Sequence, residues 1–109
     1  SDPTSSQIRK ASLVLEVNGV RHPLSPPGVV LGRGTEADLR INDPGISRRH
    51  ARIEVSGDGA DQLITIEDLG STNGIVINGQ RVRQATLNAG SRFEIGSTRI
   101  AITSPGADV

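Results

Sequence analysis

Short runs of alternating apolar and polar residues fill most of the chain, and glycine or proline interrupts them every few positions. Residues 50–55, His-Ala-Arg-Ile-Glu-Val, alternate small or apolar with polar side chains, which is the period of two of a half-buried β-strand. No stretch keeps an apolar repeat at helical spacing through about a dozen positions. The pattern therefore predicts an all-β protein.

Ten segments have the composition and the flanking turn residues of strands. They are residues 13–17, 20–24, 29–33, 38–41, 50–55, 63–69, 75–77, 80–82, 91–95 and 99–102. Asn18-Gly19 and Asn78-Gly79 are two-residue hairpin signals, and Pro23 places its strand at a sheet edge. Short strands at regular spacing predict a sandwich or a small barrel, with function in the loops 32–38, 42–49 and 69–74.

The length of 109 residues fits one hydrophobic core. Residues 1–11 and 104–109 are mostly polar or small, and we expect tails or linkers there, with one domain at 12–103. The core must consist of Val, Ile, Leu and Ala, because Phe93 is the only aromatic residue. The chain has no cysteine, so the fold depends on neither a disulfide nor a cysteine-ligated metal.

Charge argues against several classes of partner. The 12 basic and 12 acidic residues give a formal net charge of zero, and neither a basic stripe nor stacking aromatics are present for nucleic acid. No apolar run approaches the ~20 residues that span a bilayer, and the first residues lack the features of a signal peptide. We expect a cytoplasmic domain without membrane insertion. All basic residues but Lys10 are arginine, which favours phosphate or carboxylate binding, although a GC-rich genome gives the same bias.

Four short motifs occur in order at predicted strand ends: Gly32-Arg33, Ser47-Arg48-Arg49-His50, Ser71-Thr72-Asn73-Gly74 and Asn78-Gly79. Each is common alone, but their order and placement are hard to obtain by chance. Together they closely resemble the signature of the forkhead-associated (FHA) family, and the resemblance extends over about 29–102. It implies an antiparallel β-sandwich of about 10–11 short strands with binding loops at one end. It also implies a bacterial, phosphothreonine-dependent adaptor that is not an enzyme and needs no cofactor or metal.

The chemistry of these residues suits a phosphothreonine, which carries about −1.5 to −2 charges and needs fixed donors. Arg33 offers a guanidinium fork at a strand end, and Ser47 offers a hydroxyl. The resemblance implies that Arg33 and Ser47 bind phosphate with Arg48 and Thr72 beside them, and that Asn73 holds the peptide backbone. The loops are then supported by Gly32, His50 and Gly74. The expected partner is a phosphorylated Ser/Thr protein kinase or its substrate.

Other interpretations of the same residues remain open. Ser47 and His50 could form a hydrolase pair, although the chain has no G-x-S-x-G elbow, and the sandwich could serve phosphate-independent assembly. Thr4 could be a phosphorylated site that docks into the pocket, which its flanking residues do not favour.

The remaining charged residues have plain interpretations. We expect Asp38, Asp43 and Asp68 to be turn acceptors, and Arg81, Arg83, Arg92 and Arg99 to lie on solvated strand faces, where some could line a second interaction surface.

Overall fold

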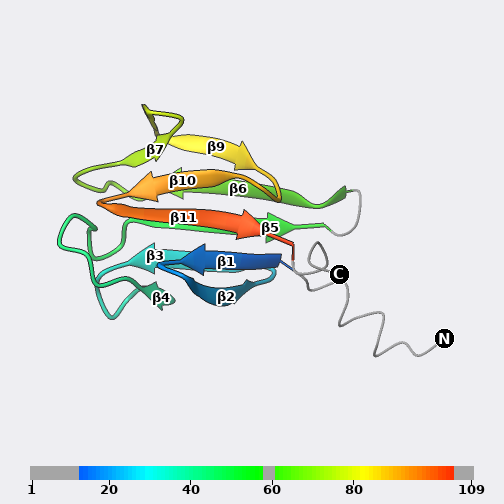
Figure 1. The fold of residues 1–109 in the computed structure, drawn as a ribbon, viewed down its shortest axis with the longest axis horizontal. Coiled ribbons are helices and arrows are strands. Elements are labelled where there is room, and N and C mark those ends of the chain that lie inside the picture. The colour runs from blue at the N-terminus through cyan, green and yellow to red at the C-terminus, as the bar shows by residue number, and fades with distance from the viewer. Residues whose placement is uncertain (1–12, 58–60, 105–109) are drawn as a thin grey trace.

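A computed structural model describes residues 13–57 and 61–104, in which the strands form two sheets packed face to face (Figure 1). The strands are β1 (Leu13–Val17), β2 (Val20–Leu24), β3 (Gly28–Gly32), β4 (Leu39–Arg40), β5 (Ala51–Ser56), β6 (Leu63–Asp68), β7 (Ile75–Ile77), β8 (Gln80–Val82), β9 (Gln84–Leu87), β10 (Arg92–Ile95) and β11 (Thr98–Thr103). The predicted all-β sandwich is confirmed.

One sheet has six strands in the order β2-β1-β11-β10-β7-β8, and the other has five in the order β4-β3-β5-β6-β9. The pairs are antiparallel except β3 with the two-residue β4, where Leu31 pairs with Leu39 in parallel. Strand β2 lies at an edge, as Pro23 predicts. The topology brings the first and last described strands together, because β1 pairs with β11 in the six-stranded sheet.

The core lies between the sheets and is built from the inward positions of alternating strands. In β5, Ala51, Ile53 and Val55 are buried, whereas Arg52 and Glu54 face outward. Phe93 joins the aliphatic residues with only 3 % of its surface exposed. Each fully buried large aliphatic side chain contributes about 1.5–3 kcal/mol. This packing fixes the strand ends from which the loops emerge.

Strand β9 (Gln84–Leu87) is missing from the sequence prediction. Its first three residues are exposed or half-buried, and only Leu87 is fully buried. No turn marks its start, because the chain passes from β8 in one sheet to β9 in the other through the single residue Arg83. Strand β9 therefore owes its conformation to pairing with β6.

The three loops predicted to carry function meet at one end of the sandwich, the left end in Figure 1, and β1 begins and β11 ends at the opposite end. The predicted tails and Thr4 lie outside the described residues, except for the half-buried Ser104. Between β5 and β6 the structure describes the chain as far as Gly57 and again from Asp61. In the ranges 13–57 and 61–104, no helix is long and apolar enough to cross a membrane. The same residues contain no group of acidic, His or Cys side chains suited to a metal ion.

Candidate functional site

The first two loops are joined through their backbones. Arg33 N–H donates to the Ser47 carbonyl at 2.9 Å, and Gly34 N–H donates to the Arg48 carbonyl at 3.1 Å. A β-carbon on Gly32 would collide with the Arg48 carbonyl oxygen. Gly32 is therefore required by close backbone approach, and it lets the end of β3 pack directly against the loop that carries Ser47 and Arg48.

Arg33 follows β3 directly and is exposed, but its side chain is anchored. Its Nε donates a hydrogen bond of 2.9 Å to the carbonyl of Ile46 in the second loop. This contact uses the inner N–H of the guanidinium, and the two terminal nitrogens make no hydrogen bond to other residues within the described part of the chain. A fork held in this way is suited to an oxyanion, because less side-chain freedom is lost on binding.

The Ser47 hydroxyl joins the second loop to the third. Thr72 N–H donates to Ser47 Oγ at 3.1 Å, across 25 positions of sequence. Because this oxygen is the acceptor in that bond, the hydroxyl hydrogen of Ser47 remains available as a donor. Ser47 is half-buried, whereas Thr72 and Arg48 are exposed beside it. The structure thus brings Arg33, Ser47, Arg48 and Thr72 to the same end of the molecule.

His50 is completely buried beneath these loops. Its Nδ1 accepts the backbone N–H of Ser47 at 3.0 Å, and its Nε2 lies 2.7 Å from the Gly74 carbonyl. A backbone N–H can only donate and a carbonyl can only accept, so we assign the neutral ring protonated at Nε2. Both ring nitrogens are occupied by backbone groups, and neither is bonded to the Ser47 hydroxyl.

The third loop is organised by its own side chains. Asp68 Oδ1 accepts the N–H of Ser71 at 2.9 Å, and Ser71 Oγ accepts the N–H of Gly74 at 2.8 Å. Gly74 has a φ of +76°, a conformation that glycine adopts without strain. Burial alone would raise the pKa of Asp68, but hydrogen bonds from Ser71 outweigh it and leave that pKa lowered. The loop is therefore held by an ionised carboxylate at neutral pH.

Asn73 stands at the tip of this loop and reaches back to the second one. Its Nδ2 donates to the Gly45 carbonyl at 2.8 Å, which leaves its Oδ1 as an exposed acceptor. Gly45 is itself fixed, because its N–H donates to Oδ1 of the buried Asp43 at 2.8 Å. The hydroxyl of Thr98 is the main cause of the lowered pKa of Asp43, with the N–H groups of Gly45 and Ser97 adding to it.

The three aspartates predicted as turn acceptors all accept backbone N–H bonds, but not all of these bonds are local. Asp43 and Asp68 cap their own turns through Gly45 and Ser71. Asp38 instead accepts from Val30, eight residues away in β3. The carboxylates therefore also tie separate segments together.

Arg81 in β8 is exposed on its strand, as predicted, but it also lies beside the third loop, which was not predicted from the sequence. Its Nη2 donates to the Thr72 carbonyl at 3.2 Å, and its side chain lies against Gly74. The signal was present in the Asn78-Gly79 turn, because a two-residue hairpin fixes the register that pairs Val76 with Arg81. The hairpin returns this arginine to the loop that precedes β7.

Comparison with known proteins identifies the family. The FHA domain model matches residues 29–96, so the chain belongs to the FHA family of phosphothreonine-dependent interaction domains. It is 34% identical over 85 residues to the FHA domain-containing protein FhaA of Mycobacterium tuberculosis. It is 35% identical over 91 residues to the glycogen accumulation regulator GarA of Mycolicibacterium smegmatis. These alignments cover 78% and 83% of this chain but only 15% and 55% of the relatives.

Solved structures share the fold over most of its length. The FHA domain of the CT664 protein from Chlamydia trachomatis superposes with a TM-score of 0.75 at 31% identity, covering 85% of this chain and 97% of that domain. The FhaA FHA domain, solved in complex with the intracellular domain of Rv3910, gives a TM-score of 0.73 at 32% identity over 84% of this chain and 99% of that one. Its partner in that complex is a protein domain.

Proposed function

We propose that this chain is a phosphothreonine-dependent adaptor domain that binds a Ser/Thr protein kinase or a kinase substrate. Arg33 and Ser47 contact the phosphate with Arg48 and Thr72 beside them, and Asn73 holds the peptide backbone next to the phosphothreonine. Membership of the FHA family supports the class of ligand. The observation that carries the site assignment is the bond from Thr72 N–H to Ser47 Oγ, which brings the second and third loops together.

The electrostatics of the loops support a single phosphate as the ligand. Arg33, Arg48 and Arg49 are exposed at this end, although the chain as a whole has no net charge. The carboxylates of Asp43 and Asp68 face inward to backbone donors, and the exposed Glu36, beside Gly34 and Arg48, offsets only one of the three arginine charges. A dianion therefore meets a local excess of arginine, and the neutral whole molecule does not favour polyanions.

We also propose that the domain has no hydrolase activity. Ser47 and His50 are in contact, but through the backbone N–H of the serine and not through its hydroxyl. The second nitrogen of His50 holds the Gly74 carbonyl, where a hydrolase would need an orienting carboxylate. This arrangement supports a structural role for His50, with Gly32 and Gly74 as further supports of the loops. We propose that no metal or cofactor is needed.

We further propose that residues 12–103 suffice for binding and that the domain acts in the cytoplasm. Described strands extend from Leu13 to Thr103, beyond both ends of the family match, which supports the wider boundaries. A phosphothreonine made by a protein kinase requires ATP as the phosphate donor. A domain that recognises it is expected in the compartment that holds ATP.

Calorimetric titration tests the function directly, with phosphothreonine, phosphoserine and unphosphorylated versions of one peptide pool. We expect micromolar binding to phosphothreonine alone, with at least about a tenfold preference over phosphoserine because a pocket for one methyl group is worth about 1–3 kcal/mol. Arg33→Ala should abolish binding, whereas Arg92→Ala, a matched loss of charge in β10, should not. Equal binding to phosphorylated and unphosphorylated peptides would overturn the proposal, and normal binding by Arg33→Ala would move the site elsewhere.

A further inference from the structure

Arg81 lies outside the three loops in sequence, yet its side chain is held against the third one. Its Nη2 donates to the Thr72 carbonyl at 3.2 Å. The guanidinium also lies over Gly74, so close that a β-carbon at this glycine would collide with Arg81 Nε. The guanidinium therefore contacts both neighbours of Asn73, the residue that we propose holds the peptide backbone.

The charge of Arg81 is not neutralised by the rest of the domain. The side chain is exposed and has no carboxylate partner among residues 13–57 and 61–104. Its cross-strand neighbour in β7 is the apolar Val76. Arg52 differs from Arg81 in this respect, because it pairs with Glu67 at 3.8 Å.

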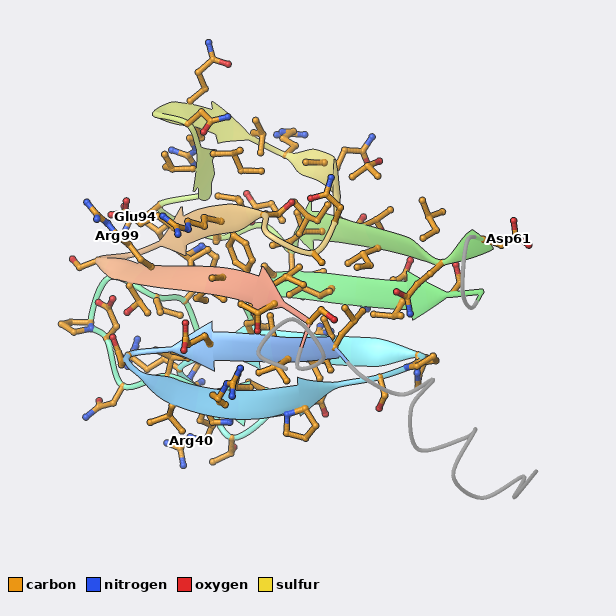
Figure 2. The ribbon with its side chains drawn as sticks, turned by 45° about the vertical axis from the view of Figure 1, so that its right-hand side comes forward. Arg40, Asp61, Glu94 and Arg99 are labelled. Carbon is orange, nitrogen blue, oxygen red and sulfur yellow. The ribbon has the colours of Figure 1, made fainter. Side chains whose placement is uncertain are left out.

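Arg99, on the outer face of the six-stranded sheet, has an acidic residue as its cross-strand neighbour. It stands opposite Glu94 in the register of β10 and β11, and the two side chains lie side by side in Figure 2. Arg40 is a second exposed arginine near the site, but it extends from the opposite side of the sandwich from the β7–β8 hairpin (Figure 2). Its Nε contact with the Arg33 carbonyl is long, at 3.4 Å. Arg81 is therefore the exposed guanidinium that borders Asn73.

We propose that Arg81 selects an acidic side chain in the phosphopeptide, an inference that rests on the proposed function of the loops. A guanidinium presents five N–H donors, of which Arg81 uses one on Thr72, so a fork remains for a carboxylate. The contact with Thr72 restricts the side chain before the ligand arrives and reduces the entropy lost on binding. Because Arg81 contacts both neighbours of Asn73, which we propose holds the backbone next to the phosphothreonine, the recognised Asp or Glu lies close to the phosphothreonine in the peptide sequence.

The probe is a neutral phosphothreonine peptide with alanine at every other variable position, and variants of it that carry a single Asp at each of these positions. We expect Asp at one position, on one side of the phosphothreonine, to raise affinity by about two- to fivefold at low salt, the range of a solvent-exposed ion pair. Arg81→Gln should remove this gain, and Arg81→Glu should transfer it to Lys at the same position. Arg83→Gln, the same loss of charge two residues away, should leave the gain intact.

Each other outcome has a distinct meaning. A gain from Asp that persists in Arg81→Gln, or no positional gain in the native protein, overturns the role of Arg81. If Arg81→Gln weakens the neutral phosphothreonine peptide as much as the Asp peptide, Arg81 only braces the Thr72 loop, and the proposal is wrong. If the neutral peptide binds no better with phosphate than without it, the proposed function itself fails, independently of Arg81.

Discussion

The hydroxyl of Thr98 donates a hydrogen bond of 2.7 Å to Oδ2 of Asp43, across 55 positions of sequence. The same oxygen accepts the N–H of Ser97 at 2.8 Å, and the other carboxylate oxygen accepts from Gly45. The carbonyl of Gly45 in turn accepts from Asn73. The start of β11 therefore holds the second loop in place. That loop in turn positions the side chain of Asn73 in the third loop.

Acid should weaken the domain through Asp43. The pKa of Asp43 in the folded protein lies below its ordinary value of 3.8, chiefly because of the Thr98 hydroxyl. The folded state therefore binds fewer protons than the unfolded state as the pH falls. The stabilisation is complete above the ordinary pKa and is lost as the pH drops through the folded value. We expect the free energy of unfolding, from urea titrations followed by circular dichroism, to decrease below about pH 5.

Asp43→Asn removes the contribution of Asp43 to the pH dependence of stability. The contribution of Asp68 remains in both the variant and the native protein. The variant should be less stable at neutral pH and should lose less stability on acidification. Glu54→Gln, at an exposed position of β5, serves as the control and should follow the native protein. An acid dependence of Asp43→Asn that runs parallel to the native curve would show that Asp43 does not carry the effect.

Removal of the His50 ring should destabilise the whole domain. His50→Ala leaves the part-buried Ser47 N–H and the buried Gly74 carbonyl without their partners and creates a cavity. We expect a loss of about 2–4 kcal/mol in the free energy of unfolding. His22→Ala on the edge strand β2 should cost no more than about 0.5 kcal/mol. Similar losses for both histidines would mean that the loop contacts of His50 do not stabilise the fold.

A methyl group at Gly32 should separate the first two loops. The obstacle is the Arg48 carbonyl, a backbone atom that cannot move without the loop, so Gly32→Ala should cost about 1–3 kcal/mol and weaken phosphopeptide binding. Gly34→Ala is the matched control. Its added methyl first meets the flexible Glu36 carboxylate and then Arg48 Cβ at 3.0 Å, so a smaller loss of stability is expected. Equal losses in urea titrations would contradict the importance of the Gly32 contact.

The side-chain amide of Asn73 should be needed as a hydrogen-bond donor as well as an acceptor. Asn73→Asp keeps an acceptor but places a carboxylate against the Gly45 carbonyl, and we expect affinity for a phosphothreonine peptide to fall about tenfold, or about 1.4 kcal/mol. Asn42→Asp is the control, because it adds the same charge to the second loop. In the described part of the chain, the side-chain bond to the Gly45 carbonyl comes from Asn73 and not from Asn42. A similar fall in both variants would assign the effect to charge alone.

Local signals in the sequence explain why most strands and all three loops could be predicted. The alternation in 50–55 matches the burial of β5, and both Asn-Gly pairs form the expected hairpins, with Asn18 and Asn78 at a φ of 52°. The loop motifs could be placed because they fall where strand patterns stop. Such features depend on residues within a few positions of one another.

The remaining features depend on contacts that a linear pattern does not encode. Strand β9 forms because β6 offers an open edge, and of its four residues only Thr86 is β-branched or aromatic, the types enriched in strands. Asp43 has the sequence of an ordinary turn acceptor, and only the packing of the two sheets brings Thr98 to it. Arg81 looks like any arginine on a hairpin until the third loop is placed beside it.

The first and last described strands, β1 and β11, are neighbours, and their outer ends lie at the opposite end of the sandwich from the three loops (Figure 1). The start of β1 and the end of β11 therefore both lie at the rear of the domain, the end away from the three loops. Such a layout suits insertion into a longer protein, since both tethers leave the front clear for a partner as bulky as a folded kinase. For the same reason, an affinity handle or a dye at either terminus should report on binding without obstructing it.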